Sequence, residues 1–131
     1  MKRLLFTFLM VIMAAYVIAQ ESTHPLAYPP SPDARYRLYP TQNMYMFLRL
    51  DTKTGQIIQV QWSTKGSEYR FTSTLSNIDL TYGDTTATAG RFMLYPTTNI
   101  YNFLLIDQKD GRTWQVQWSH EPENRLITRI W

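Results

Sequence analysis

The sequence contains no cysteine among its 131 residues, so no disulfide can stabilise the fold in any compartment. Histidine is scarce, with two residues, and charged side chains make up only 18% of the chain. Catalytic and metal sites are built from such groups, and their spacing here pairs no nucleophile with a base. No cofactor-binding motif is present. We therefore expect a protein that is not an enzyme and that holds neither a metal nor a cofactor.

Long hydrophobic runs are also missing, except near the N-terminus. A basic start precedes an apolar stretch over residues 4–18, and Val17 and Ala19 are the small residues that signal peptidase requires. Residues 1–19 are thus predicted to be a signal peptide, with Gln20 as the first mature residue. The stretch is short for a membrane span of about 20 residues. We expect an exported protein, periplasmic or extracellular, with no stable membrane insertion after cleavage; an uncleaved signal anchor is the alternative.

The sequence also lacks a cluster of basic residues. Removal of Lys2 and Arg3 lowers the number of basic residues from 13 to 11, against 10 acidic residues, and leaves a mature net charge of about +1. Binding to nucleic acid depends on clustered positive charge. Nucleic acid is therefore excluded as a partner.

Present instead is an internal duplication. It pairs Arg35–Ser63, RYRLYPTQNMYMFLRLDTKTGQIIQVQWS, with Arg91–Ser119, RFMLYPTTNIYNFLLIDQKDGRTWQVQWS. Seventeen of these 29 positions are identical at a fixed offset of 56, and a weaker match follows at an offset of 55. The mature chain then divides into a proline-rich segment (20–34), a first repeat (35–75), a connecting segment (76–90) and a second repeat (91–131). We expect the two repeats to form one domain.

Each repeat is predicted to contain four antiparallel strands, and no sustained helical period follows the signal peptide. In the first repeat the strands are expected at Arg35–Pro40, Tyr45–Asp51, Gln56–Ser63 and Tyr69–Leu75, with counterparts in the second. Gly55 and Gly111 are placed for a positive φ angle in four-residue hairpin loops. The predicted fold is all-β, two four-stranded meanders packed as a pseudo-symmetric β-sandwich or barrel. The alternative is propeller-blade-like units, which require an oligomer because two blades cannot close a ring.

The hairpin register assigns the strand residues of each repeat to two faces. One face, named here the aromatic face, contains Tyr45, Phe47, Val60 and Trp62, and in the second repeat Tyr101, Phe103, Val116 and Trp118. The other, named the leucine face, contains Leu48, Leu50, Gln59 and Gln61, and in the second repeat Leu104, Ile106, Gln115 and Gln117. We expect the aromatic face to form the core in both repeats, with both tryptophans buried and the glutamines pointing outward.

The glutamines are the candidate binding residues, because an exposed strand would accept many polar side chains and both repeats keep this one. Glutamine offers a donor and an acceptor together, which suits sugar hydroxyls or a partner's backbone. The candidate site comprises Gln59, Gln61, Gln115 and Gln117, together with His120 and Asn124 in a loop. Two alternatives stay open: the amides can be satisfied between strands or repeats, or the binding surface can lie in the loops 64–68 and 120–124, where the repeats diverge.

Other polar residues have structural interpretations. Asp51 and Asp107 are expected to bind backbone N–H groups in the hairpin turns rather than calcium. Asn43 and Asn99 are expected to close the corner after the first strand, since asparagine tolerates the left-handed conformation. The histidine and two glutamates of residues 120–123 are interpreted as a solvated loop and not as a metal site.

The repeated motif LYPTxNxYxFLxxDxKxGxxxQVQWS, at Leu38–Ser63 and Leu94–Ser119, resembles a motif of small exported bacterial proteins of uncharacterised function. The resemblance covers most of the mature chain. It implies a location in the bacterial envelope or outside the cell. It carries no catalytic residue.

The sequence favours an exported, non-enzymatic binding module whose partner is a protein, as for inhibitors and immunity proteins of similar size. The alternative is a carbohydrate-binding module that uses tyrosine, tryptophan, glutamine and asparagine. A hydrolase that uses Glu68 and Glu123 is less favoured. An exposed tryptophan beside the glutamines would favour a glycan, whereas a flat face without aromatic residues would favour a protein.

Overall fold

The computed structural model describes residues 31–131, which form one compact unit. The predicted signal peptide, its cleavage before Gln20 and most of the proline-rich segment lie outside the described residues. Residues 31–131 contain eight strands and two short 3₁₀ turns, η1 (Ser67–Tyr69) and η2 (Pro122–Asn124). The all-β prediction is therefore confirmed. No helix in this part of the chain is long and apolar enough to cross a membrane.

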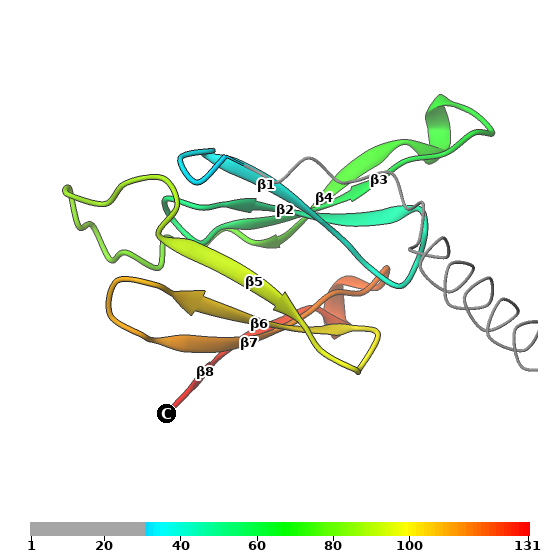
Figure 1. Cartoon of the computed structure of the whole chain (residues 1–131). Helices are drawn as coiled ribbons and strands as arrows, with labels where there is room; N and C mark the ends of the chain where they lie inside the picture. The colour runs from blue at the N-terminus through cyan, green and yellow to red at the C-terminus, as the bar shows by residue number, and fades with distance from the viewer. Residues whose placement is uncertain (1–30) are drawn as a thin grey trace, which may run out of the picture. The chain divides into compact units, whose positions relative to one another are not determined.

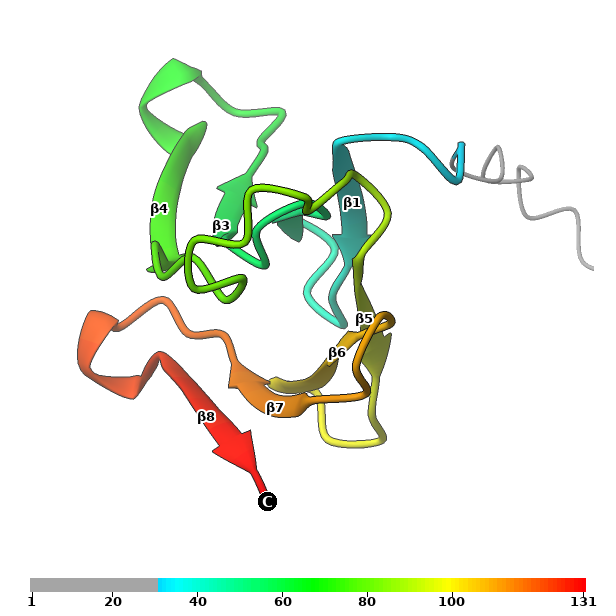
Figure 2. The same ribbon diagram turned by 90° about the vertical axis from the view of Figure 1, so that its left-hand side faces the viewer.

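The strands form two antiparallel sheets, one from each repeat (Figure 1). Sheet 1 contains, in spatial order, β1 (Tyr36–Pro40), β2 (Met46–Asp51), β3 (Ile57–Gln61) and β4 (Phe71–Ser76). Sheet 2 contains β5 (Phe92–Pro96), β6 (Asn102–Asp107), β7 (Thr113–Gln117) and β8 (Leu126–Ile130). Each sheet is a meander, because every strand pairs with its neighbour in the chain. Figure 2 shows both sheets running from β1 and β5 on one side to β4 and β8 on the other.

The predicted register is confirmed in both repeats. Phe47 pairs with Val60 between β2 and β3, and Phe103 pairs with Val116 between β6 and β7. The strands are a little shorter than predicted, since β3 ends at Gln61 and β7 at the equivalent position. The side-chain faces therefore alternate along each strand as the sequence indicates.

The hairpin loops also form as predicted. Gly55 and Gly111 have φ angles of 82° and 79°, which residues with a side chain rarely adopt. The Oδ1 atoms of Asp51 and Asp107 each accept a hydrogen bond of 2.9 Å from the backbone N–H two residues later. Both aspartates therefore stabilise the turns of their own hairpins.

The two sheets pack face to face and share one core, which confirms the sandwich. Sheet 1 and the connecting segment contribute Met46, Leu48, Leu50, Ile57 and Leu80 to this core. Sheet 2 contributes Phe92, Leu94, Phe103, Leu105, Trp114, Val116 and Trp118. Burial of these side chains is the main force that holds the repeats together, since each stabilises by about 1.5–3 kcal/mol.

The two repeats bury opposite faces of their sheets, which corrects the prediction of a common core face. Sheet 2 buries its aromatic face, and Trp118 is 2% exposed, whereas its counterpart Trp62 is 39% exposed. Sheet 1 buries its leucine face, and Leu48 is fully buried, whereas its counterpart Leu104 is 38% exposed. The prediction is right for the second repeat and wrong for the first. Two sheets stacked in the same orientation must place the front of one against the back of the other.

Three polar contacts between the repeats accompany the apolar core, and a fourth, between Asn43 and His120, belongs to the candidate site described below. The Nε2 of Gln59 donates to the Ser119 carbonyl at 2.9 Å, and its Oε1 accepts from the Ser119 N–H at 3.1 Å. The Phe92 N–H donates to the Thr52 carbonyl at 2.8 Å. Arg125 Nη1 donates to the carbonyl of Thr74 at 3.1 Å. The outward direction predicted for Gln59 is therefore wrong, because this side chain is buried between the sheets.

A buried ionic cluster closes one end of sheet 2. Arg91 contacts Asp107 at 2.9 Å and Asp84 at 2.8 Å, and Arg112 contacts Asp107 at 3.0 Å. Burial would raise the pKa of Asp107, but the Arg91 guanidinium, the Lys109 N–H and Arg112 together lower this pKa below its usual value. The cluster therefore keeps the Asp107 carboxylate charged inside the protein.

The first repeat holds a weaker version of this cluster. Arg35 contacts Asp51 at 2.8 Å, but the arginine side chain is 47% exposed. Burial again acts to raise the pKa of Asp51, and hydrogen bonds from Arg35 and from the Lys53 N–H lower it below its usual value. The two repeats thus form equivalent arginine–aspartate contacts, and the contact in the second repeat is more deeply buried.

Candidate functional site

The Pro-Thr-x-Asn segment of each repeat forms a tight corner at one end of its sheet. In the first repeat the Thr41 hydroxyl donates to the Met46 carbonyl at 2.8 Å, and Asn43 Oδ1 accepts from the Tyr45 N–H at 2.9 Å. Asn99 makes the equivalent contact with the N–H two residues later, at 3.0 Å. The asparagines therefore close the corner through their side chains. The left-handed conformation proposed for them is wrong, because within residues 31–131 only Tyr82 and glycines have a positive φ.

This corner presents an aromatic pair in each repeat. The rings of Tyr45 and Trp62 lie 5.3 Å apart between centroids, with an interplanar angle of 56°. Trp62 Nε1 donates to the Met44 carbonyl at 2.8 Å, which fixes the orientation of the indole. The equivalent pair in the second repeat, Tyr101 and Trp118, has the same centroid distance and an interplanar angle of 48°. The difference lies in exposure, since only the pair of the first repeat has an accessible indole.

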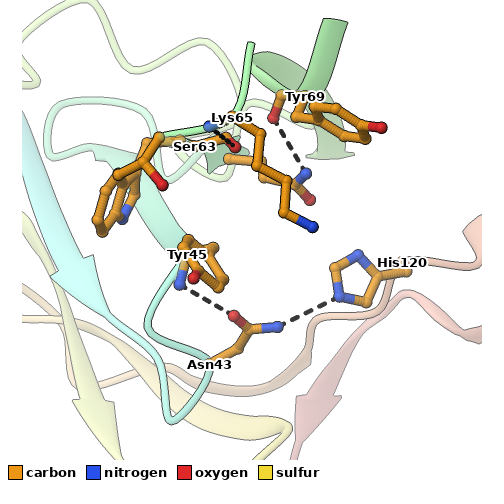
Figure 3. A pocket seen from close by; sticks show the side chains of 9 residues that line it. Asn43, Tyr45, Ser63, Lys65, Tyr69 and His120 are labelled. Carbon is orange, nitrogen blue, oxygen red and sulfur yellow. Dashed lines mark hydrogen bonds between the residues drawn. The ribbon is translucent and has the colours of Figure 1, made fainter.

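A pocket of about 240 Å³ lies beside the exposed pair, at the ends of β2 and β3 (Figure 3). The pocket is lined by Asn43, Tyr45, Gln61, Trp62, Ser63, Thr64, Lys65, Tyr69 and His120. All but one of these residues belong to the first repeat. His120 comes from the second repeat, and its Nε2 lies 3.4 Å from Asn43 Nδ2. The pocket therefore lies where the two repeats meet.

Several contacts orient the polar groups of this pocket. Gln61 Nε2 donates to the Tyr69 carbonyl at 3.1 Å, which leaves the amide oxygen of Gln61 for another donor. Lys65 Nζ lies 5.9 Å from the centroid of the Tyr69 ring, a cation–π distance. The Lys65 backbone N–H donates to Ser63 Oγ at 3.0 Å. Figure 3 shows the Lys65 side chain extending into the pocket, between Tyr45 and His120.

The residues that line the first pocket determine what it can do chemically. Its lining combines aromatic rings, amides, an ammonium group and an imidazole, and it includes no carboxylate. Hydrolysis of glycosides uses two carboxyl groups that flank the substrate. Neither Glu68 nor Glu123 lines the pocket, although sequence analysis named both for a hydrolase. The lining can stack against a ring, bond to hydroxyl groups and pair with an anion.

The second repeat forms a related pocket from equivalent positions. It is lined by Tyr101, Gln117, Trp118, Ser119, His120, Glu121 and Asn124. Gln117 Nε2 donates to the Asn124 carbonyl at 2.8 Å, which parallels the contact of Gln61 in the first repeat. Glu121 occupies the position that corresponds to Lys65. The two pockets therefore share their frame and differ in the sign of one charge.

The structure separates the six predicted site residues into two groups. Four of them line the pockets: Gln61 the first, Gln117 and Asn124 the second, and His120 both. The other two, Gln59 and Gln115, line neither pocket. Gln59 is buried between the sheets, and Gln115 is half-buried on the outside of sheet 2, where its Nε2 donates to Asn102 Oδ1 at 2.8 Å.

Sequence reasoning did not name Tyr45, Lys65 or Tyr69 among the site residues, although Lys65 lies in the loop 64–68 that it gave as an alternative binding surface. Tyr45 recurs in both repeats, but the register assigned it to a buried face, so its repetition was explained by packing. Lys65 and Tyr69 lie in and after the loop where the repeats diverge, and they have no conserved counterpart within the chain. Divergence of a loop that borders a repeated aromatic pair is the one signal that could have found them.

Within residues 31–131, no group of three or more histidine, aspartate or glutamate side chains is placed to hold a metal ion. No protein-family model and no curated protein matches the sequence, and no solved structure matches the fold.

Proposed function

We propose that this chain is an exported, non-enzymatic binding module whose first pocket binds a carbohydrate that carries a carboxylate. The observation that supports this function is the exposed indole of Trp62 beside Gln61, the arrangement that favours a glycan over a protein. Tyr45 and Tyr69 add two aromatic side chains at the same place. A volume of about 240 Å³ suits a single sugar residue rather than a larger ligand.

The charge of the pocket supports the acidic character of the sugar. Lys65 and His120 line it, and no carboxylate accompanies them. An ammonium group that faces a partly enclosed site binds a carboxylate more strongly than it binds a hydroxyl group. Export is supported by the N-terminal pattern of residues 1–19 and by the resemblance of the repeated motif to exported bacterial proteins.

A protein partner is the second candidate, and a different observation favours it. Large apolar side chains are exposed on the outer faces of both sheets, with Leu38, Tyr95 and Leu126 among them. Contiguous apolar patches on a soluble protein usually mark an interface with another protein. This candidate uses the sheet faces and not the pocket, so the two can be tested separately.

The test of the carbohydrate proposal is a titration of the purified exported protein with neutral sugars and with uronic acids, followed by calorimetry. We expect uronic acids to bind and neutral sugars to bind more weakly. The Lys65→Met variant should lose at least about tenfold in affinity for uronic acids, since a hydrogen bond to a charged group contributes about 1.5–3 kcal/mol. Its affinity for neutral sugars should not change.

The matched control is Lys53→Met, because Lys53 lies in the hairpin loop at the other end of sheet 1. This variant should bind every sugar as the wild type does. Equal affinity of the wild type and Lys65→Met for uronic acids would contradict the proposed site. Absence of binding to every acidic and neutral sugar would contradict the carbohydrate function itself.

A further inference from the structure

The joint between the two repeats is made from two different faces of one repeated unit. The leucine face of sheet 1 packs on the aromatic face of sheet 2. No other part of residues 31–131 covers the aromatic face of sheet 1 or the leucine face of sheet 2. The two outer faces of the sandwich are therefore counterparts of the two faces that form its core.

The outer faces keep the apolar character of their buried counterparts. On the aromatic side, Leu38 is 60% exposed, whereas its counterpart Leu94 is 1% exposed. On the leucine side, Leu104 is exposed and Leu48 is buried. The exposed apolar residues of the aromatic face of sheet 1 are Tyr36, Leu38, Tyr45 and Trp62, and those of the leucine face of sheet 2 are Tyr95, Leu104, Leu126 and Ile130. Such patches require a partner or reduce solubility.

The polar contact of Gln59 with Ser119 has its own counterpart on these outer faces. Gln115 occupies the position of Gln59 in the second repeat, and Ser63 occupies the position of Ser119 in the first. Gln115 is half-buried on the leucine face of sheet 2, and Ser63 lies two residues beyond the end of β3 in sheet 1. A copy of the internal joint would bring this amide to the backbone of that serine.

The backbone contact from Phe92 to Thr52 can be repeated in the same way. The equivalent residues are Tyr36 and Gln108, and both are exposed. Tyr36 lies at the start of β1 and Gln108 at the end of the β6 strand, as the contacting residues do in their own sheets.

The contact from Arg125 to the Thr74 carbonyl provides the third case. At the offset of 55, the equivalents are Arg70, which is exposed, and Arg129 on β8. Each of these three contacts thus has a set of equivalent positions, one partner in each sheet. Gln115 and Arg70 bond within their own repeats, to Asn102 and to the Gly66 carbonyl, and would have to exchange or share these bonds in the assembly.

We propose that a second copy of this chain packs the aromatic face of its sheet 1 on the leucine face of sheet 2, and that repetition of this contact closes a ring. A contact between two different faces adds copies head to tail, and it ends in a ring when the rotation closes. Rings of radially repeated four-stranded sheets have about four to eight sheets, which corresponds to about two to four copies. β1 and β5 lie on the same side of both sheets and would face the ring axis (Figure 2).

The ring also completes the second pocket. In the first pocket, His120 of the following repeat supplies one wall. Thr64 is the counterpart of His120, so Thr64 of the neighbouring copy occupies the equivalent place beside Asn99. Tyr45 and Trp62 belong both to the first pocket and to the aromatic face of sheet 1, so the ring would cover the Trp62 indole as the internal joint covers Trp118. Sugar binding as proposed above therefore takes place on the unassembled chain, and the ring itself does not rest on it.

The test measures the mass of the purified exported protein by light scattering across a range of concentrations. The wild type should assemble into a species of about two to four chains. Leu38→Arg blocks one outer face and Leu104→Arg blocks the other, so each variant alone should be monomeric. Thr85→Arg, at an exposed position of the connecting segment, is the matched control and should assemble as the wild type does.

Mixing the two blocked variants distinguishes head-to-tail from symmetric contact. Each variant retains one intact face, and the two intact faces are complementary, so the mixture should form a dimer with one chain of each kind and nothing larger. A mixture that stays monomeric would overturn the proposal. Assembly of either variant alone would also overturn it, since a symmetric dimer needs only one face.

The remaining outcomes are equally decisive. A wild type that is monomeric at every concentration, or that grows into filaments, would contradict the ring. Circular dichroism and a melting curve establish that each arginine variant is folded. If either has lost its strand signal, Leu38→Ser and Leu104→Ser replace it, with the same expected masses.

Discussion

The side-chain amide of Gln59 is paired with the backbone of Ser119, with hydrogen bonds of 2.9 and 3.1 Å in opposite directions. Gln59 is 1% exposed, and both Ser119 groups belong to the other repeat, whereas its third partner, Ser73 Oγ at 3.3 Å, belongs to its own. Glutamine is needed here because it provides a donor and an acceptor at the spacing of a peptide group. The repeated Gln-Val-Gln-Trp-Ser segment therefore contains both halves of the joint, the amide in one copy and the serine in the next.

We predict that Gln59→Ala destabilises the fold by about 1–3 kcal/mol, because the half-buried Ser119 N–H would lose its side-chain acceptor and the Ser119 carbonyl would keep only the hydrogen bond from Arg125 Nε. With both variants made in the Leu38→Arg background, where chains do not assemble head to tail, Gln115→Ala should have a smaller effect, since within the chain Gln115 bonds only to the half-buried Asn102 side chain. Urea denaturation of both variants measures the difference. An equal loss of stability in the two variants would contradict the assignment of Gln59 to the joint.

Strand positions and register could be predicted from the sequence, because side-chain alternation and two glycine turns determine them locally. The choice of the buried face could not be predicted in this way, since both faces of each repeat are apolar. The signal lay in the positions that differ. Asn102 and Thr113 replace Met46 and Ile57 on the leucine face, and Arg49 stands where the aromatic face of sheet 2 has a leucine. Each polar residue marks the face that stays outside the sandwich.

The candidate site was predicted only in part. Gln61 and His120 could be named because polar residues at strand ends and in divergent loops are often functional. Gln61 and His120 line the same pocket because the second repeat packs on the first. This packing places His120 next to Asn43, although the two residues are 77 positions apart in the sequence. Divergence of the loop 64–68 indicated the region of Lys65, but only the folded loop places Lys65 and Tyr69 beside the aromatic pair.

The two hairpin glycines differ in their surroundings, which leads to a second prediction. Both have a positive φ, so alanine should destabilise each by about 1–2 kcal/mol. A Cβ atom on Gly55 would in addition lie 2.8 Å from Leu80 Cδ1, whereas one on Gly111 would meet nothing within 4 Å. Gly55→Ala should therefore lower the melting temperature more than Gly111→Ala does. The reverse order would show that Leu80 does not pack on this hairpin.

The third prediction compares the ionic contacts. Asp107→Asn should destabilise the protein by about 3–5 kcal/mol, because it leaves the buried Arg91 with an incomplete partner set. Asp51→Asn should cost less, since the exposed Arg35 regains water and surface pairs contribute about 0–1 kcal/mol. Chemical denaturation at neutral pH measures both. Equal effects would mean that burial of the Asp107 cluster does not contribute to its strength.

The same aspartate predicts a dependence on pH. The pKa of Asp107 is lower in the folded state than in the unfolded state, so the folded protein releases this proton more readily. Its contribution to stability is complete above about pH 4, the usual aspartate value, and is lost as the pH falls through the lower folded pKa. The wild type should therefore lose more stability below pH 4 than Asp107→Asn does. Parallel pH profiles of the two proteins would exclude this contribution.

The packing of opposite faces is tested most directly by two pairs of alanine variants, measured in the Leu38→Arg background, where chains cannot assemble head to tail. Trp118→Ala should cost about 3–5 kcal/mol and Leu48→Ala about 2–5 kcal/mol in urea denaturation, because both side chains are buried between the sheets. Their counterparts Trp62→Ala and Leu104→Ala should each cost clearly less. If Trp62 and Trp118 are equally costly and Leu48 and Leu104 equally tolerant, both repeats bury the same face, and the joint described here is wrong.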